Sequence, residues 1–145
     1  MPIGFEIDEV WRSRGRGFQM GIIQNSGVVV HLTGQVSWSP AEEIIGKGNI
    51  EKQTRQCFVN IQSLLVKVGG ELSDIVSITT YFTDRSQLLH IQKVRTEFLT
   101  DGFEPASTSV MVAGLGHEDF LVELTPIAVI PKGRFSLPNC SELRL

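Results

Sequence analysis

Hydrophobic side chains recur every three or four residues in two parts of the chain, a spacing that predicts amphipathic helices. The first helix is expected over residues 50–68, where charged and amide side chains fill the other faces. Its hydrophobic stripe consists of Cys57, Phe58, Ile61, Leu64, Leu65 and Val68. Gly69 and Gly70 follow the stripe and should end the helix, because glycine adopts the left-handed conformation of a helix cap without steric cost.

A second stripe predicts a helix over residues 87–100. It is made of Leu88, Ile91, Val94, Phe98 and Leu99. Ser86 is the expected N-cap, since a hydroxyl can accept a hydrogen bond from an unpaired amide of the first turn. Gly102 and Pro105 should close the helix.

Three strands are predicted before the second helix. Residues 18–24 and 28–32 are apolar runs that flank Asn25-Ser26-Gly27, and because Asn and Gly tolerate positive φ angles, we expect these two strands to form a hairpin. Residues 74–82 alternate and are rich in β-branched side chains, which is typical of a strand.

Two further strands are expected near the end of the chain, over residues 107–112 and 120–130. The glycine-bearing residues 113–119 between them suit a second hairpin. Pro126 lacks an amide hydrogen, so we expect an edge position or a bulge there. Residues 36–49 contain many turn-forming residues and are predicted to be a loop.

The resulting order, β-β-α-β-α-β-β, predicts an α+β sandwich in which both helices pack on one face of the sheet. The other face then has no helix to cover it, which points to burial against further copies of the chain. We expect one domain over residues 1–145, with a core from about 18 to 131 and a tail over 132–145.

Composition narrows the function classes. The 145 residues include 41% hydrophobic and 20% charged residues, an ordinary balance for a globular protein. The net charge of −3 disfavours nonspecific binding to nucleic acid, which depends on many Lys and Arg contacts to phosphate. The basic cluster Arg12, Arg14 and Arg16 makes only a small patch.

The cysteines do not indicate a disulfide bond, and the histidines do not indicate a metal site. Cys57 belongs to the hydrophobic stripe, and Cys140 alone predicts no disulfide framework. His31 and His90 have no partner at metal-ligand spacing, so no zinc site is expected. With no signal peptide pattern and no long apolar run, a cytoplasmic protein without a membrane segment is expected.

Several motifs occur in the order and spacing of one known family. They are Leu32-Thr33-Gly34-Gln35, Val68-Gly69-Gly70, Leu72-Ser73-Asp74-Ile75-Val76, Thr79-Thr80-Tyr81-Phe82-Thr83-Asp84, Pro105-Ala106 and Val122-Glu123. Over about residues 18–131 the chain thereby resembles the Rid/YjgF family. The resemblance implies a chorismate-mutase-like fold and a homotrimer that binds small molecules in clefts between subunits. It implies no cofactor.

One departure from the family pattern bears on the ligand. Family members that hydrolyse 2-imino or enamine acids have an arginine directly after Pro-Ala, and this arginine binds the substrate carboxylate. The chain has Ser107 at that position. A serine hydroxyl donates one neutral hydrogen bond where a guanidinium donates two charge-assisted ones, so we expect a changed ligand.

The family's other pocket positions correspond by motif to Phe18, Thr33, Gly34, Ser109 and Glu123. Glu123 is the candidate catalytic residue, because imine hydrolysis needs a group that accepts a proton from water. An ordinary glutamate on the polar face of a strand is the alternative interpretation.

Further candidates come from exposed segments. Arg14 and Arg16 precede Phe18 and are hypothesised to bring a guanidinium into the cleft, against the alternative of solvated charges. Trp38 could cover a ligand or simply pack. Residues 117–119, His-Glu-Asp, form an exposed polar turn or border the pocket.

Three functions follow from the sequence. The first is a hydrolase or deaminase that acts on a small imine, enamine or related metabolite with Glu123 and water. The second is a trimeric binding or regulatory protein that has lost this chemistry. The third, an endoribonuclease or translation inhibitor, is attributed to some relatives, and the acidic charge balance disfavours it.

Overall fold

The computed structural model describes residues 2–100, 104–139 and 141–144. Its strands are β1 (Ile3–Phe5), β2 (Gly21–Ile23), β3 (Val28–His31), β4 (Ile75–Phe82), β5 (Ala106–Met111) and β6 (Val122–Ile130). Its helices are α1 (Ile50–Val66) and α2 (Leu88–Phe98), each with a short 3-10 turn close by, at Leu72–Asp74 and Arg85–Gln87. The α+β class is confirmed.

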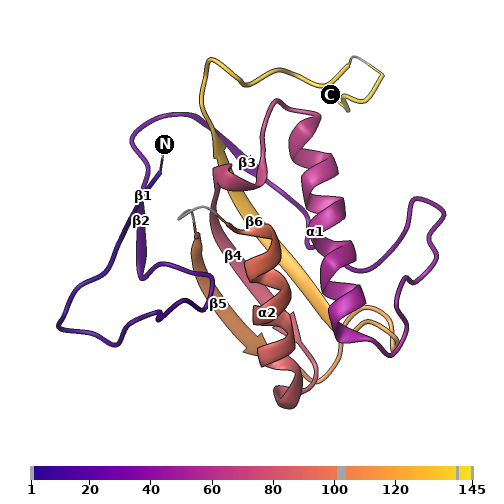
Figure 1. Ribbon diagram of the computed structural model, residues 1–145. Coiled ribbons are helices and arrows are strands. Elements are labelled where there is room, and N and C mark those ends of the chain that lie inside the picture. The colour runs from indigo at the N-terminus through magenta and orange to yellow at the C-terminus, as the bar shows by residue number, and fades with distance from the viewer. Residues whose placement is uncertain (1, 101–103, 140, 145) are drawn as a thin grey trace.

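The main sheet has four strands in the order β3-β6-β4-β5, and α1 and α2 lie next to each other on one of its faces (Figure 1). Phe58 of α1 stacks on Phe98 of α2 at 4.8 Å between ring centroids. The predicted packing of both helices on one face is therefore correct.

The first predicted hairpin is wrong. β2 pairs with β1, a strand that we did not predict, and β3 pairs antiparallel with β6. Turn residues permit a chain reversal but do not choose the partner strand. β6 pairs with β4 along one edge and with β3 along the other edge, so β3 joins the main sheet instead of β2.

The second predicted hairpin is also wrong. β5 pairs parallel with β4, and β6 lies on the other side of β4. Parallel neighbours need a crossover connection, and α2 supplies it between β4 and β5. The predicted strands exist, but the helix between them decides their order.

Polar side chains cap α1 and the 3-10 turn that precedes α2, whereas Gln87, the N-cap residue of α2 itself, makes no capping hydrogen bond through its side chain. Asn49 caps α1, with its Oδ1 accepting from the amide of Lys52 at 3.0 Å. Before α2, Asp84 rather than the predicted Ser86 is the cap of the preceding 3-10 turn, because its longer reach lets the carboxylate accept from both the amide and the hydroxyl of Ser86. Gly69 ends α1 with φ +77° as predicted, and Gly102 lies outside the described residues.

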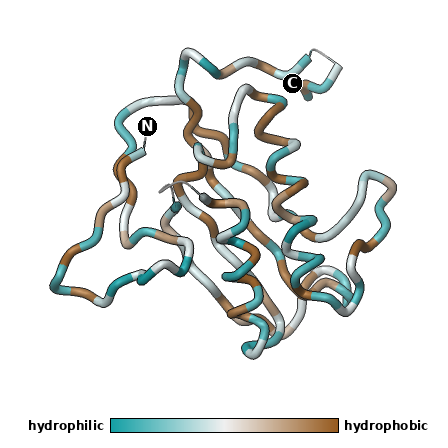
Figure 2. Tube along the Cα trace, in the orientation of Figure 1, coloured by the Kyte–Doolittle hydropathy of each residue, from teal (hydrophilic) through white to brown (hydrophobic). Residues whose placement is uncertain are grey.

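The core lies between the helices and the sheet, and along both helices hydrophobic turns alternate with hydrophilic ones (Figure 2). Its fully buried side chains include Phe58, Ile61, Ile78, Ile91 and Leu124. The side chain of Arg95 is buried among them, with 2% of the residue exposed. An arginine in such a place is uncommon and needs partners.

Pro126 marks a bulge rather than a sheet edge, because β6 is a central strand. The amide of Leu32 donates to the carbonyl of Pro126, and the next paired residues are Gln35 and Leu124. One chain thus advances three residues while the other advances two, which leaves Thr33–Gly34 bulged. Since proline cannot return a hydrogen bond, the ladder is interrupted at this place.

The C-terminal segment folds back against the C-terminal end of α1. Arg134 forms an ion pair with the buried Asp74 at 2.5 Å, and the amide of Ser136 donates to the carbonyl of Val68. Lys67 and Glu142 add an exposed ion pair at 2.9 Å. Residues 132–145 were predicted as a tail, and Arg134, Ser136 and Glu142 of this tail contact the domain.

Candidate ligand-binding site

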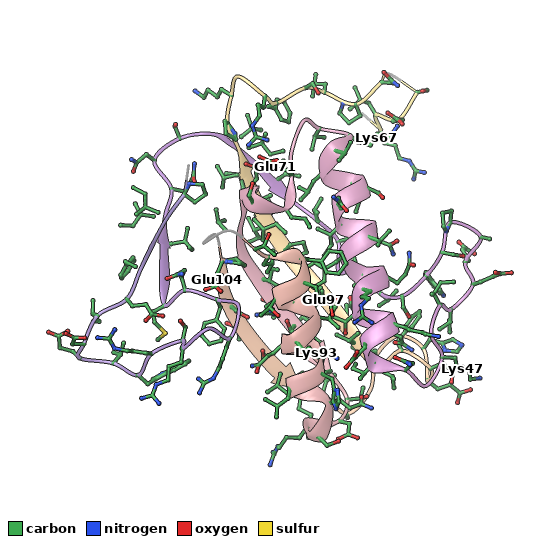
Figure 3. The ribbon with its side chains drawn as sticks, viewed as in Figure 1. Lys47, Lys67, Glu71, Lys93, Glu97 and Glu104 are labelled. Carbon is green, nitrogen blue, oxygen red and sulfur yellow. The ribbon has the colours of Figure 1, made fainter. Side chains whose placement is uncertain are left out.

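The N-terminal segment lies along the free edge of β5. The amide of Gln19 donates to the carbonyl of Pro105 at 3.0 Å, and Gln19 bridges to Ala106 in parallel register. The side chain of Gln19 also reaches Glu104, which Figure 3 labels just before β5. These bonds hold the segment against the sheet. The segment thereby forms one wall of a cleft.

An open cleft of about 450 Å³ lies between this segment, α2 and β5. Its lining comprises Trp11, Arg16, Phe18, Leu88, Leu89, Gln92, Ser107 and Ser109. The rings of Trp11 and Phe18 meet edge to face at 5.9 Å, and the guanidinium of Arg16 lies 5.9 Å from the centre of the Trp11 ring. The cleft thus brings together four predicted site residues, Arg16, Phe18, Ser107 and Ser109.

Arg95 lies behind Ser107, one of the residues that line this cleft. Its Nη1 donates to the Ser107 hydroxyl at 2.5 Å, and its Nη2 donates to the Thr80 hydroxyl at 2.7 Å. Its Nε has no partner, and no carboxylate among the described residues is in ion-pair contact with it. Burial lowers the pKa of Arg95 to about 10, so the guanidinium stays charged at neutral pH.

Sequence reasoning did not identify Arg95, although its position carries a signal. Arg95 comes four residues after Ile91 and seven after Leu88, which places it on the hydrophobic stripe of α2. Its burial follows from that spacing. Gly17 covers the alkyl part of Arg95, because a Cβ on Gly17 would lie 3.0 Å from the Arg95 Cδ.

Glu123 lies at a second place, next to the bulge. Gly34 is so close that a Cβ there would collide with the Glu123 carboxylate and would contact the Thr125 hydroxyl at 3.0 Å. The carboxylate is half-buried, and no hydrogen bond or ion pair joins it to another described residue. The missing side chain of Gly34 therefore lets the Glu123 carboxylate lie close against the backbone of the bulge.

Strand register puts Ser107 and Glu123 on opposite faces of the sheet. Ser107 is paired with Ile78, and Glu123 is paired with Tyr81, three residues further along β4. Side chains of a strand alternate between faces, so an odd separation reverses the face. Ser107 faces the helices and Glu123 faces the uncovered side, so within one copy the two side chains do not converge on one small ligand.

The remaining predicted residues lie elsewhere. Thr33 is exposed in the bulge, and its carbonyl accepts from the Gln35 side chain. Arg14 lines a separate recess beside Arg12 and Ser13. Trp38 packs edge to face on Phe120 at 5.1 Å, away from the cleft floor.

The polar turn at residues 117–119 has structural contacts. Asp119 forms an ion pair with Lys47 at 2.9 Å, and the amide of Asp119 donates to the His117 ring at 3.0 Å. Among the described residues, no group of three His, Cys, Asp or Glu side chains is arranged to hold a metal ion. Within residues 2–100, 104–139 and 141–144, no helix is both long and apolar enough to cross a membrane.

Known proteins share both sequence and fold with this chain. Residues 17–130 match the family described as Endoribonuclease L-PSP. A RutC family protein of Pyrococcus abyssi is 31% identical over 102 residues, which cover 70% of this chain and 79% of that protein. The mitochondrial protein mmf1 of Schizosaccharomyces pombe is 33% identical over 103 residues, covering 70% and 62%.

Solved structures agree. YyfB from Yersinia pestis, a Rid family protein of unknown function, superposes with a TM-score of 0.84 at 24% identity, covering 89% of this chain and 98% of that one. RidA from the Antarctic bacterium Psychrobacter sp. superposes with a TM-score of 0.65 at 26% identity, covering 78% and 88%. The expected chorismate-mutase-like fold is therefore confirmed.

Proposed function

This chain belongs to the Rid/YjgF family, and on that premise we propose that it is a deaminase-type hydrolase of a small reactive imine or enamine. The family supports a small-molecule deaminase or hydrolase in general terms. The observation that carries the specific proposal is the Glu123 carboxylate, half-buried beneath Gly34 with its acceptor positions free among the described residues.

Glu123 would act as the general base. In the hydrolysis of an imine, water attacks the carbon of the C=N bond, and the carboxylate accepts a proton from that water. The same proton then passes to the nitrogen, which gives a carbinolamine. The carboxylate next accepts the proton of the new hydroxyl and transfers it to the nitrogen as the C–N bond breaks, so ammonia leaves and the carbon keeps the oxygen as a carbonyl. The balance requires only water, so the proposal includes no cofactor.

A second copy of the chain would complete the site. Ser107 and Glu123 face opposite sides of one sheet, so a ligand that contacts both must lie between two copies. The uncovered face also carries apolar side chains, among them Val29 with 55% of the residue exposed and Val110 with 38%. We propose a homotrimer with one such cleft at each interface, and a cytoplasmic location.

Ser107 would alter specificity relative to relatives with arginine at this position. The cleft beside it has aromatic and aliphatic walls from Trp11, Phe18, Leu88 and Leu89. Such walls favour a substrate with a small apolar side chain.

Ammonia release tests the proposal. A panel of 2-imino acids is generated in situ by an amino acid oxidase, and ammonia formation is followed with the parent protein, with Glu123→Gln and without protein. We expect the parent to accelerate release and Glu123→Gln to fall at least about a hundredfold, the usual contribution of a general base. A parent rate equal to the protein-free rate for every imine would contradict the proposal and would favour a non-catalytic binding protein.

A further inference from the structure

Arg95 carries a buried charge, since only 2% of the residue is exposed. An isolated cation inside a protein is costly, and buried charges are normally paired with an opposite charge. Arg95 has only two neutral hydroxyl partners, Ser107 and Thr80, and an Nε without any partner among the described residues. Among the described residues, no opposite charge compensates the guanidinium at this place.

The hydrogen bond between Arg95 and Ser107 fixes the direction in which the Ser107 hydroxyl can donate. A guanidinium can only donate, so the Ser107 oxygen must accept from Arg95. The hydroxyl hydrogen of Ser107 then remains available to donate to another group. Because Ser107 lines the cleft, that group can be a bound ligand.

We propose that Arg95 and Ser107 together form a carboxylate-binding site in the cleft, in which Ser107 contacts the anion and Arg95 is the positioning residue behind it. The ligand class is a small monocarboxylate. The inference deepens the proposed function, since it rests on the same cleft and specifies the charge of the substrate.

Two features of the surroundings support an anion here. Arg16 adds a second guanidinium to the cleft lining. Gly17, with φ +81°, lets the N-terminal segment pass close over the alkyl part of Arg95, a residue that is 2% exposed. A charge in such surroundings interacts more strongly with an anion than a fully solvated one does.

The test compares pyruvate with its uncharged amide, pyruvamide, by calorimetric titration of the full-length protein. We expect the parent to bind pyruvate at least about tenfold more tightly than pyruvamide, because a charge-assisted hydrogen bond is roughly twice as strong as a neutral one. Arg95→Met should abolish this preference, and Arg95→Lys should restore part of it. Arg55→Met, which removes an exposed guanidinium paired with Glu97, should keep the parent ratio.

A second pair of variants keeps the test informative if Arg95→Met fails to fold. Ser107→Val replaces the donor with a methyl and should bring the two affinities close together. Ser63→Val makes the same replacement on an exposed face of α1, away from the cleft, and should not. An unchanged preference in folded Arg95→Met or in Ser107→Val would overturn the inference, as would a parent that shows no preference for the anion.

The inference and the proposed function fail in different ways. A protein that prefers pyruvate through Arg95 but releases no ammonia would have the site without the chemistry. A protein that releases ammonia through Glu123 with an unchanged preference in Arg95→Met would have the chemistry without this site.

Discussion

Arg95 donates a hydrogen bond to Ser107 at 2.5 Å, and this bond joins the crossover helix to the strand that follows it. The two residues belong to α2 and β5, and the pairing of β5 with β4 holds Ser107 in place. Where relatives have an arginine after Pro-Ala, this chain has a serine with a guanidinium behind it. The positive charge is therefore present at the cleft but comes from another element.

Introducing arginine at position 107 alone should destabilise the folded protein. Ser107→Arg would place a second guanidinium close to Arg95, with no carboxylate of the described residues between them. We expect a loss of roughly 1–4 kcal/mol in the free energy of unfolding, the repulsion of two unit charges about 4 Å apart in a partly solvated site. Urea unfolding of the variant and the parent measures the difference.

The double variant Arg95→Ser/Ser107→Arg serves as the control for that prediction. It exchanges the two side chains and leaves one guanidinium at the cleft. Its stability should exceed that of Ser107→Arg, and it should still bind pyruvate in preference to pyruvamide. Equal stability of the single and the double variant would show that the two charges do not interact.

Gly34→Ala should abolish hydrolysis without unfolding the protein. The new methyl group would collide with the Glu123 carboxylate and displace it from the position in which we propose that it accepts a proton from water. We expect the ammonia-release rate to fall at least about a hundredfold, as for loss of the base itself. Gly114→Ala is the matched control, because a Cβ at Gly114 has no described atom within 4 Å. Activity in Gly34→Ala close to that of the parent would argue against the role of Glu123.

The lowered pKa of Glu51 should make the stability of the folded protein depend on pH. Hydrogen bonds from His90 and Lys93 of α2 lower the pKa of the Glu51 carboxyl in α1 to about 2. Since the folded pKa lies below the unfolded value of 4.5, this stabilisation is complete above about pH 4.5 and is lost as the pH falls towards 2. Figure 3 labels Lys93 on α2, from which it reaches Glu51 at 3.0 Å.

Urea unfolding at several pH values between 6 and 2.5 tests this dependence with Glu51→Gln. The parent should be more stable than the variant at pH 6, and the difference should shrink as the pH falls. Glu43→Gln, for which the described residues give no ion pair, is the control and should differ little from the parent at any pH. A difference between parent and Glu51→Gln that stays constant with pH would contradict the assignment.

Local elements were predictable from the sequence, because they depend on neighbouring residues. The α1 stripe, its glycine cap and strand β4 all follow from periodicity and steric rules within one segment. Strand partners were not predictable in the same way. β3 and β5 each pair with a strand distant in sequence, and turn residues such as Gly27 or Gly114 carry no information about that choice.

The candidate site shows the same division. Motif matching identified Phe18, Ser107 and Ser109, which the fold brings to one cleft, and also Glu123, which it places on the other face. Arg95 was missed because an arginine on a hydrophobic stripe is usually taken as a residue whose charge reaches solvent. Trp11 was missed because the N-terminal segment shows no strong periodicity, although it forms part of the cleft wall.

Mixing two variants that should each be inactive tests the central claim, that one site takes Ser107 with Arg95 from one copy and Glu123 from another. Arg95→Met removes the charge that we propose attracts the substrate carboxylate, and Glu123→Gln removes the base. Arg95→Met and Glu123→Gln are unfolded together, refolded in equal amounts and assayed for ammonia release. If each site lies between two copies, about one quarter of the interfaces should combine two unaltered halves and regain activity. Recovery of about a quarter of the parent rate is the predicted result, and a mixture as inactive as either variant alone would contradict the account.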